Sequence, residues 1–116
     1  MKSINKIFLA GYLATSPETR QTTTGKTVTT FSLATNEGYI DKSNQKIQQT
    51  DFHRIITWQH LAEVCEKYLK KGYGVLLEGK LKNRNYVAKD GQKRFITEVI
   101  AHDLSILTRP SEKDQA

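Results

Sequence analysis

The chain has 116 residues, of which 37% are hydrophobic and 26% are charged. This length suits one domain with a modest core. Lys and Arg number 18 against 12 Asp and Glu, and the formal net charge of +6 favours a polyanionic partner, nucleic acid before an anionic membrane surface. The single cysteine, Cys65, excludes an intramolecular disulfide and indicates a reducing compartment. No apolar run approaches the roughly 20 residues of a membrane span.

Alternating apolar residues, bounded by turn-forming residues, predict five β-strands. Both faces of the first strand are apolar, as in a strand within a closed barrel or under a partner subunit. Lys6 lies beside its apolar stretch, so the N-terminus is interpreted as a strand and not as a signal peptide. The strands are predicted over residues 4–13, 28–35, 50–58, from 73 into a hairpin that turns at 89–92, and from 94 to about 107.

One segment, residues 59–71, has apolar residues at helical spacing, and Gly72 supplies a C-terminal stop. The polar segment 36–49 predicts a long loop or a protruding hairpin. Three strands, one helix and two strands predict an all-β protein, a five-stranded OB-fold Greek-key barrel with one α-helix between strands 3 and 4. The barrel domain is expected over residues 1–109, followed by a short polar tail over 110–116.

Residues that could carry catalysis do not form a recognisable site. The three histidines, His53, His60 and His102, have no metal-ligand spacing with one another or with Cys65. No strand-turn-helix motif surrounds a serine, and the glycines at 72 and 74 end a helix where a phosphate-binding loop would begin one. We therefore expect a protein that is not an enzyme and that has no cofactor and no metal.

Aromatic residues accompany basic ones at several places. Tyr39 lies in the polar segment with Lys42, and Phe52 and Trp58 share a strand face with Arg54. A further ring, Tyr86, shares the face of its strand with Lys80, Lys82 and Arg84. Exposed single-stranded bases need flat rings, and their backbone needs cations, so this pattern favours binding of single-stranded nucleic acid.

The alternative is that Phe52, Trp58 and Tyr86 are core residues with basic neighbours at the rim. For Trp58 the two interpretations are nearly balanced, because it immediately precedes the helix. If the binding interpretation holds, the four rings and the nearby cations should form one continuous track over the barrel.

The chain resembles the bacterial single-stranded DNA-binding protein family over nearly all of residues 4–108. The resemblance is carried by the segments NKIFLAGYLATSPETR, TTFSLATNEGYID, TDFHRIITWQHLAEVCEKYLKKG, VLLEGKLKNRNY and DGQKRFITEVI. The succession of DFHR, LAE, YLKKG and EGKL is the most specific part. This resemblance implies an OB-fold homotetramer around which single strands are wrapped.

The resemblance also implies roles for individual residues. Tryptophan is usual in the family where this chain has Tyr39, Phe52 and Tyr86, and the departures His60 and Asn85 stand where lysine is common. His53 falls at a subunit-interface position. Base-stacking positions are Tyr39, Phe52, Trp58 and Tyr86, and basic nucleic-acid-binding positions are Lys6, Arg20, Lys42, Arg54, Lys71, Lys82 and Arg84.

The implied function is sequence-independent binding and protection of single-stranded DNA in replication, recombination and repair. The expected location is the cytoplasm, at the nucleoid, with the mitochondrial matrix as the alternative. A primosomal accessory factor or an RNA-binding OB module on the same fold are the competing interpretations. The family's usual acidic tip, which recruits replication and repair proteins, is absent from the ending RPSEKDQA, so recruitment by that route is expected to fail while strand coating remains.

Overall fold

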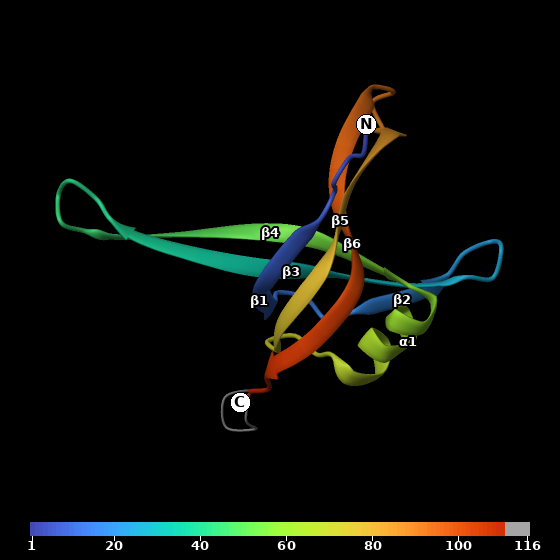
Figure 1. The fold of residues 1–116 in the computed structure, drawn as a ribbon. Coiled ribbons are helices and arrows are strands. Elements are labelled where there is room, and N and C mark those ends of the chain that lie inside the picture. Colours follow the sequence, from blue (N-terminus) through green and yellow to red (C-terminus); the bar gives the residue numbers. More distant parts are fainter. Residues whose placement is uncertain (111–116) are drawn as a thin grey trace.

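The structure is a computed structural model that describes residues 1–110 of the chain. The predicted tail at 110–116 therefore lies outside the described residues from position 111 onward. Strands dominate, and a single helix follows the fourth strand in the described part (Figure 1). The elements are β1 (Ile7–Leu13), β2 (Glu18–Gln21), β3 (Thr27–Ile40), β4 (Lys46–Trp58), α1 (Gln59–Tyr68), β5 (Gly74–Val87) and β6 (Lys93–Thr108).

Five of these strands close into a barrel. Hydrogen-bonded neighbours follow the order β1-β5-β6-β4-β3, and β1 pairs again with β3, so the sheet returns to its own edge. The pairs are antiparallel except β4 with β6, which run parallel where Ile55 and Ile56 lie beside Val99 and Ile100. This closure confirms the predicted five-stranded OB-fold barrel, with the helix between its third and fourth strands.

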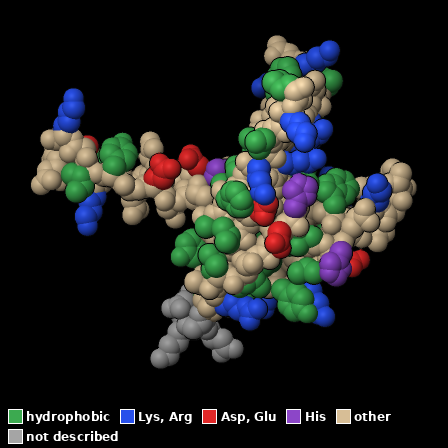
Figure 2. Space-filling model, in the orientation of Figure 1, with side chains coloured by type: hydrophobic (Ala, Val, Ile, Leu, Met, Phe, Trp, Pro, Cys, Tyr) green, Lys and Arg blue, Asp and Glu red, His purple; other side chains and the backbone are tan. Residues whose placement is uncertain are grey.

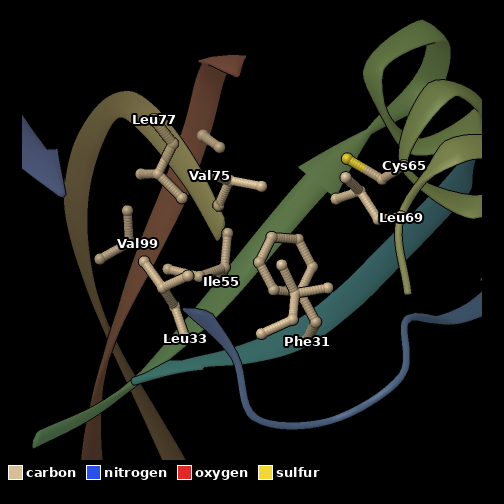
Figure 3. Packing of buried hydrophobic residues seen from close by; sticks show 10 residues of the cluster. Phe31, Leu33, Ile55, Cys65, Leu69, Val75, Leu77 and Val99 are labelled. Atoms are coloured by element: carbon tan, nitrogen blue, oxygen red, sulfur yellow. The ribbon is translucent and has the colours of Figure 1, made fainter. Parts of the chain in front are cut away.

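The barrel interior is filled by alternate residues of each strand. Phe31 and Leu33 of β3 and Ile55 of β4 are at most 4% exposed. Figure 3 shows them gathered with side chains of β5 and β6, and with Cys65 of the helix and Leu69 just after it at one end. The buried cluster consists of Leu13, Phe31, Leu33, Ile55, Cys65, Leu69, Val75, Leu77, Val99 and Ala101.

Helix α1 covers one end of this core. The hydroxyl of Thr29 in β3 donates a 2.8 Å hydrogen bond to the carbonyl of Ala62, which fixes the helix against the strand. The helix ends at Tyr68, so the predicted end at residue 71 was too late. Leu69 leaves the helix in an extended conformation and becomes buried in the core. Gly72 then takes a φ of +91°, a region that glycine enters without steric cost.

The β3–β4 and β5–β6 hairpins project far beyond the barrel (Figure 1). The first, the β3–β4 arm, stays paired as far as Ile40 and Lys46, and the second, the β5–β6 arm, as far as Val87 and Lys93. The radius of gyration is 16.6 Å, whereas a compact domain of this length would have about 13 Å. Of the two predictions for residues 36–49, the protruding hairpin is therefore the one observed.

Strand β2 was not predicted. It is a four-residue polar strand that pairs with β3 along the same edge that β1 uses further on. A short edge strand buries little, so it carries no apolar alternation to detect. The first strand also begins at Ile7 and not at the predicted residue 4, because the Asn5 side chain takes both hydrogen bonds with the Leu81 backbone, at 2.8 and 2.9 Å.

Within residues 1–110, no helix combines the length and apolar character that crossing a membrane would require.

Barrel closure generates a stability prediction at Gly11. A Cβ at this position would collide with the backbone carbonyl oxygen of Ala34, where β1 and β3 meet. Gly11→Ala should therefore destabilise the fold by about 1–3 kcal/mol, as overpacking of a core does. Thermal and urea unfolding measure the change.

Gly38→Ala is the matched control, because its added Cβ would meet only one atom, at 3.9 Å in ordinary contact. Equal unfolding midpoints for the Gly11 and Gly38 variants would contradict the tight closure of the barrel.

Burial of the only thiol generates a second prediction. Burial raises the pKa of Cys65 to about 11, and a hydrogen bond involving Thr57 opposes this rise more weakly. At pH 8 the folded protein should hold about 100-fold less thiolate than the unfolded chain. A thiol-reactive dye should label the native protein slowly and the urea-unfolded protein at once, and equally fast labelling of both would refute this burial.

Candidate nucleic-acid interface

The face of the barrel opposite its core carries rings and cations together. Residues that face each other on antiparallel strands point to the same side of the sheet. The β3–β4 ladder pairs Trp58 with Val28 and Arg54 with Ser32, one residue out of step with the buried pair Ile55 and Phe31. Trp58 is 39% exposed and Phe52 66% exposed, so neither ring is sealed in the core. The core interpretation of these two rings is therefore wrong.

A groove of about 530 Å³ crosses this face. Trp58 stands at its wall, and Val28, Ile56 and Ile100 supply its apolar surface. Five cationic side chains and one histidine come from strands β2, β4, β5 and β6. They are Arg20, Arg54, Lys80, Lys82, Arg84 and His102. We call this surface the groove.

A second hollow of about 350 Å³ adjoins the groove, because Thr30 and Arg54 line both. Phe52 lies in this second hollow. The exposed rings of Trp58 and Phe52 therefore lie on either side of Arg54, and the groove and the second hollow together run along the outer face of β4.

One carboxylate lies among the groove's cations. Glu98 of β6 is 2% exposed, and its oxygens accept hydrogen bonds from Arg54 Nε at 2.6 Å and from Arg84 Nε at 2.7 Å and Nη2 at 3.3 Å. Burial acts to raise the pKa of Glu98, but the bonds from Arg84 and Arg54 outweigh it and hold the pKa below its ordinary value. The bond to Glu98 likewise raises the pKa of Arg84. This buried anion is therefore satisfied by two charge-assisted partners.

Most of the predicted basic and aromatic residues on the barrel come together in this region. The groove unites Arg20, Arg54, Trp58, Lys82 and Arg84, and Phe52 is in the adjoining hollow. Tyr86, which is 40% exposed, lies further along β5 on the side of the strand that carries Lys80, Lys82 and Arg84. On the face seen in Figure 2, Lys and Arg side chains gather along the β5–β6 arm and where it joins the barrel.

Four predicted residues lie elsewhere. Tyr39 and Lys42 belong to the end of the β3–β4 arm, and the ladder places Tyr39 on the side of that arm opposite to Phe52. Lys6 forms an ion pair with Glu78 at 2.6 Å, and Lys71 follows helix α1. Within one chain, the structure therefore does not bring these four residues into the groove, and a continuous track through them stays a prediction.

The predicted interface residue His53 is half-buried on the core side of the β3–β4 ladder. Its Nε2 lies 2.9 Å from the hydroxyl of Thr35, within hydrogen-bond distance. Its directly opposite neighbour is Leu33.

Sequence reasoning did not assign Glu98 and His102 to the site. Both lie on the groove side of β6 together with Ile100. The alternation of Glu98, Ile100 and His102 could have indicated that they share one strand face. It connects them with the basic residues only once β6 is known to lie between β4 and β5.

Among the described residues 1–110, no three His, Cys, Asp or Glu side chains stand close enough to hold a metal ion.

Comparison with known proteins identifies the family. The sequence profile of the Single-strand binding protein family matches residues 4–107. Single-stranded DNA-binding protein 1 of Chlorobaculum tepidum is 41% identical over 107 residues, which are 91% of this chain and 66% of the relative. The single-stranded DNA-binding protein of Neisseria meningitidis is 39% identical over 105 residues, which are 90% of this chain and 60% of the relative. The chain thus spans about two thirds or less of these relatives' length.

Solved structures agree with this assignment. A Plasmodium falciparum SSB in complex with ssDNA superimposes with a TM-score of 0.85 and 38% identity, covering 93% of this chain and 98% of that one. A deletion mutant of the single-stranded DNA binding protein from Thermus aquaticus gives a TM-score of 0.77 and 30% identity, covering 90% of this chain and 51% of that one. With its profile match, relatives and barrel in accord, the chain belongs to the single-strand binding protein family.

Proposed function

We propose that this protein binds single-stranded DNA without regard to sequence. The observation that carries the proposal is the groove, where an exposed Trp58 ring stands beside five Lys and Arg side chains over an apolar surface. Rings stack on the face of any base, and cations engage the phosphates that lie one nucleotide's reach away. A duplex hides its base faces, so this combination favours single strands.

The bound DNA is proposed to continue from Trp58 past Arg54 to Phe52, and along β5 to Tyr86. Phe52 and Arg54 share the adjoining hollow, and Lys82 and Arg84 of the groove lie on the same side of β5 as Tyr86. Tyr39, Lys42, Lys6 and Lys71 are proposed to contact DNA beyond this groove, as wrapping of a strand around several copies would allow.

We further propose that the protein assembles as a homotetramer. Exposed apolar side chains cover the outer side of β1 and the adjoining strands: Phe8, Tyr12, Leu76 and Leu107 are 42–63% exposed. Strand pairing keeps these side chains together. In the β1–β5 pair, Ala10 lies opposite Leu76 and Tyr12 lies opposite Gly74. In the β5–β6 pair, Gly74 lies opposite Thr108, the residue after Leu107. Contiguous apolar patches on a soluble protein mark interaction sites. A closed tetramer needs a second, different contact, which we assign to the side of the β3–β4 arm that bears His53.

The proposed role is to coat and protect single strands in replication, recombination and repair, at the nucleoid in the cytoplasm, without catalysing a reaction. Contacts with other replication and repair proteins belong to the same proposal.

Loss of a stacking ring should weaken binding. Trp58→Ala and Tyr86→Ala should each reduce the affinity for a thymine oligonucleotide by about 1–3 kcal/mol, because each removes one platform for a base. Fluorescence anisotropy of a labelled oligonucleotide measures the change, and thermal unfolding checks the fold. Tyr68→Ala is the matched control, since this tyrosine is 49% exposed on helix α1 and lines none of the hollows.

The same assay at several salt concentrations tests how much the Lys and Arg side chains contribute to the affinity. The affinity should fall steeply with salt, with a log-log slope of about −0.7 for each neutralised phosphate. Binding that is insensitive to salt and to both ring substitutions would refute the proposed function. Tighter binding to a matched RNA than to DNA would favour an RNA-binding role.

Charge placed on the apolar face should break the assembly. Phe8→Glu and Tyr12→Glu would bury an unpaired carboxylate in the proposed interface, which is strongly disfavoured. Light scattering coupled to size exclusion should show a tetramer for the wild type and for Tyr68→Glu, and a smaller species for the Phe8 and Tyr12 variants. A tetramer that survives both charged variants would exclude this face.

A further inference from the structure

We propose that Glu98 is a positioning residue for DNA binding, which holds the guanidinium groups of Arg54 and Arg84 in place on the wall of the groove. This inference rests on the proposed function. According to this inference, a negatively charged side chain increases the affinity for a polyanion.

The geometry supports this role first. The three side chains come from three different strands, and the hydrogen bonds between them span 44 and 14 residues of sequence. The Glu98 side chain is 2% exposed, whereas those of Arg54 and Arg84 are 43% and 49% exposed. Glu98 is thus the anchored centre of the cluster, and each arginine reaches from it into the groove.

The bonds leave much of each guanidinium free. Glu98 engages only Nε of Arg54, and it engages Nε and Nη2 of Arg84. No other hydrogen bond among the described residues uses these two guanidinium groups. Because a guanidinium has five donors in a rigid plane, fixing one edge directs the other donors outward, where a phosphate or a base oxygen can accept them.

Positioning and charge make opposite predictions. An arginine that is held before the ligand arrives loses less conformational freedom on binding. Coulomb repulsion alone predicts that removing the Glu98 charge would tighten binding to the polyanion. Because solvent reaches the two arginines, the repulsion between Glu98 and the phosphates is screened. The affinity lost when both arginine side chains become disordered should therefore exceed the affinity gained by removing this repulsion.

The ionic state of the cluster is compatible with this role. The bonds from the two arginines hold the pKa of Glu98 below its ordinary value against the opposing effect of burial. The carboxylate therefore accepts both arginines at neutral pH. No other titratable group contacts its oxygens among the described residues.

The first experiment is Glu98→Gln, with the affinity for a thymine oligonucleotide measured at fixed pH and salt. The amide would place a donor against guanidinium donors and release at least one arginine. We expect about tenfold weaker binding, the order that two immobilised side chains supply. Glu66→Gln on helix α1 is the control: it makes the same change in net charge, it is exposed, and it should bind as the wild type does. Binding by Glu98→Gln that is as tight as wild type, or tighter, would overturn the inference.

A double-mutant cycle distinguishes positioning from a general structural effect. In an Arg54→Met, Arg84→Met background, Glu98→Gln should change the affinity no further, because it acts only through these two side chains. An equal loss of affinity in both backgrounds would show that Glu98 merely supports the fold, and it would contradict the proposal.

If a variant does not fold, the proposal can still be tested on the wild-type protein. In nitrogen-15 spectra of the free protein, two arginine Nε–H signals should be ordered and slow to exchange. If all arginine Nε–H signals are equally mobile, the proposal fails. If the wild type does not bind the oligonucleotide at all, the proposed function fails instead, whatever these spectra show.

Discussion

The two-residue period of the barrel strands is the constraint on which both the core and the groove depend. Ile55 is fully buried, while its neighbours Arg54 and Ile56 line the groove. A register slip of one residue would exchange these faces and remove both surfaces at once. The buried hydroxyls of Thr29 and Thr57 oppose such a slip: Thr57 donates to the Thr29 carbonyl at 2.9 Å, and Thr29 donates to helix α1. Both threonines are 0% exposed, and an orphaned hydroxyl there would be costly.

The groove joins residues that lie far apart in sequence because β6 runs between β4 and β5. This placement brings Glu98 to the arginines of both neighbours. A buried charge is costly without partners, and here both partners are side chains that also face the proposed ligand. Under the proposed function, one carboxylate therefore links stability to DNA binding, and a substitution of either arginine should lower both the stability of the fold and the affinity for DNA.

The sequence was sufficient for the barrel and for one half of the interface, for a physical reason. Alternation is a local property, so it located Arg54, Phe52 and Trp58 on one strand face before any contact was known. It failed where the outcome depended on pairing between distant strands. Glu98 resembled an ordinary surface glutamate until β6 was placed, and β2 was too short and polar to leave a pattern. Tyr39 was grouped with Phe52 by residue type, although the ladder puts it on the other side of its arm.

The two projecting arms and the apolar face of β1 give the proposed assembly its physical logic, because a strand leaving one groove needs further rings and cations on neighbouring copies. Whether the groove binds the bases is best measured by ultraviolet cross-linking of a thymine oligonucleotide to the wild-type protein, followed by mass spectrometry of the peptides. Binding along the groove should give adducts on Trp58, Phe52 and Tyr86. Adducts confined to Phe8, Tyr12 and Tyr68 would contradict it.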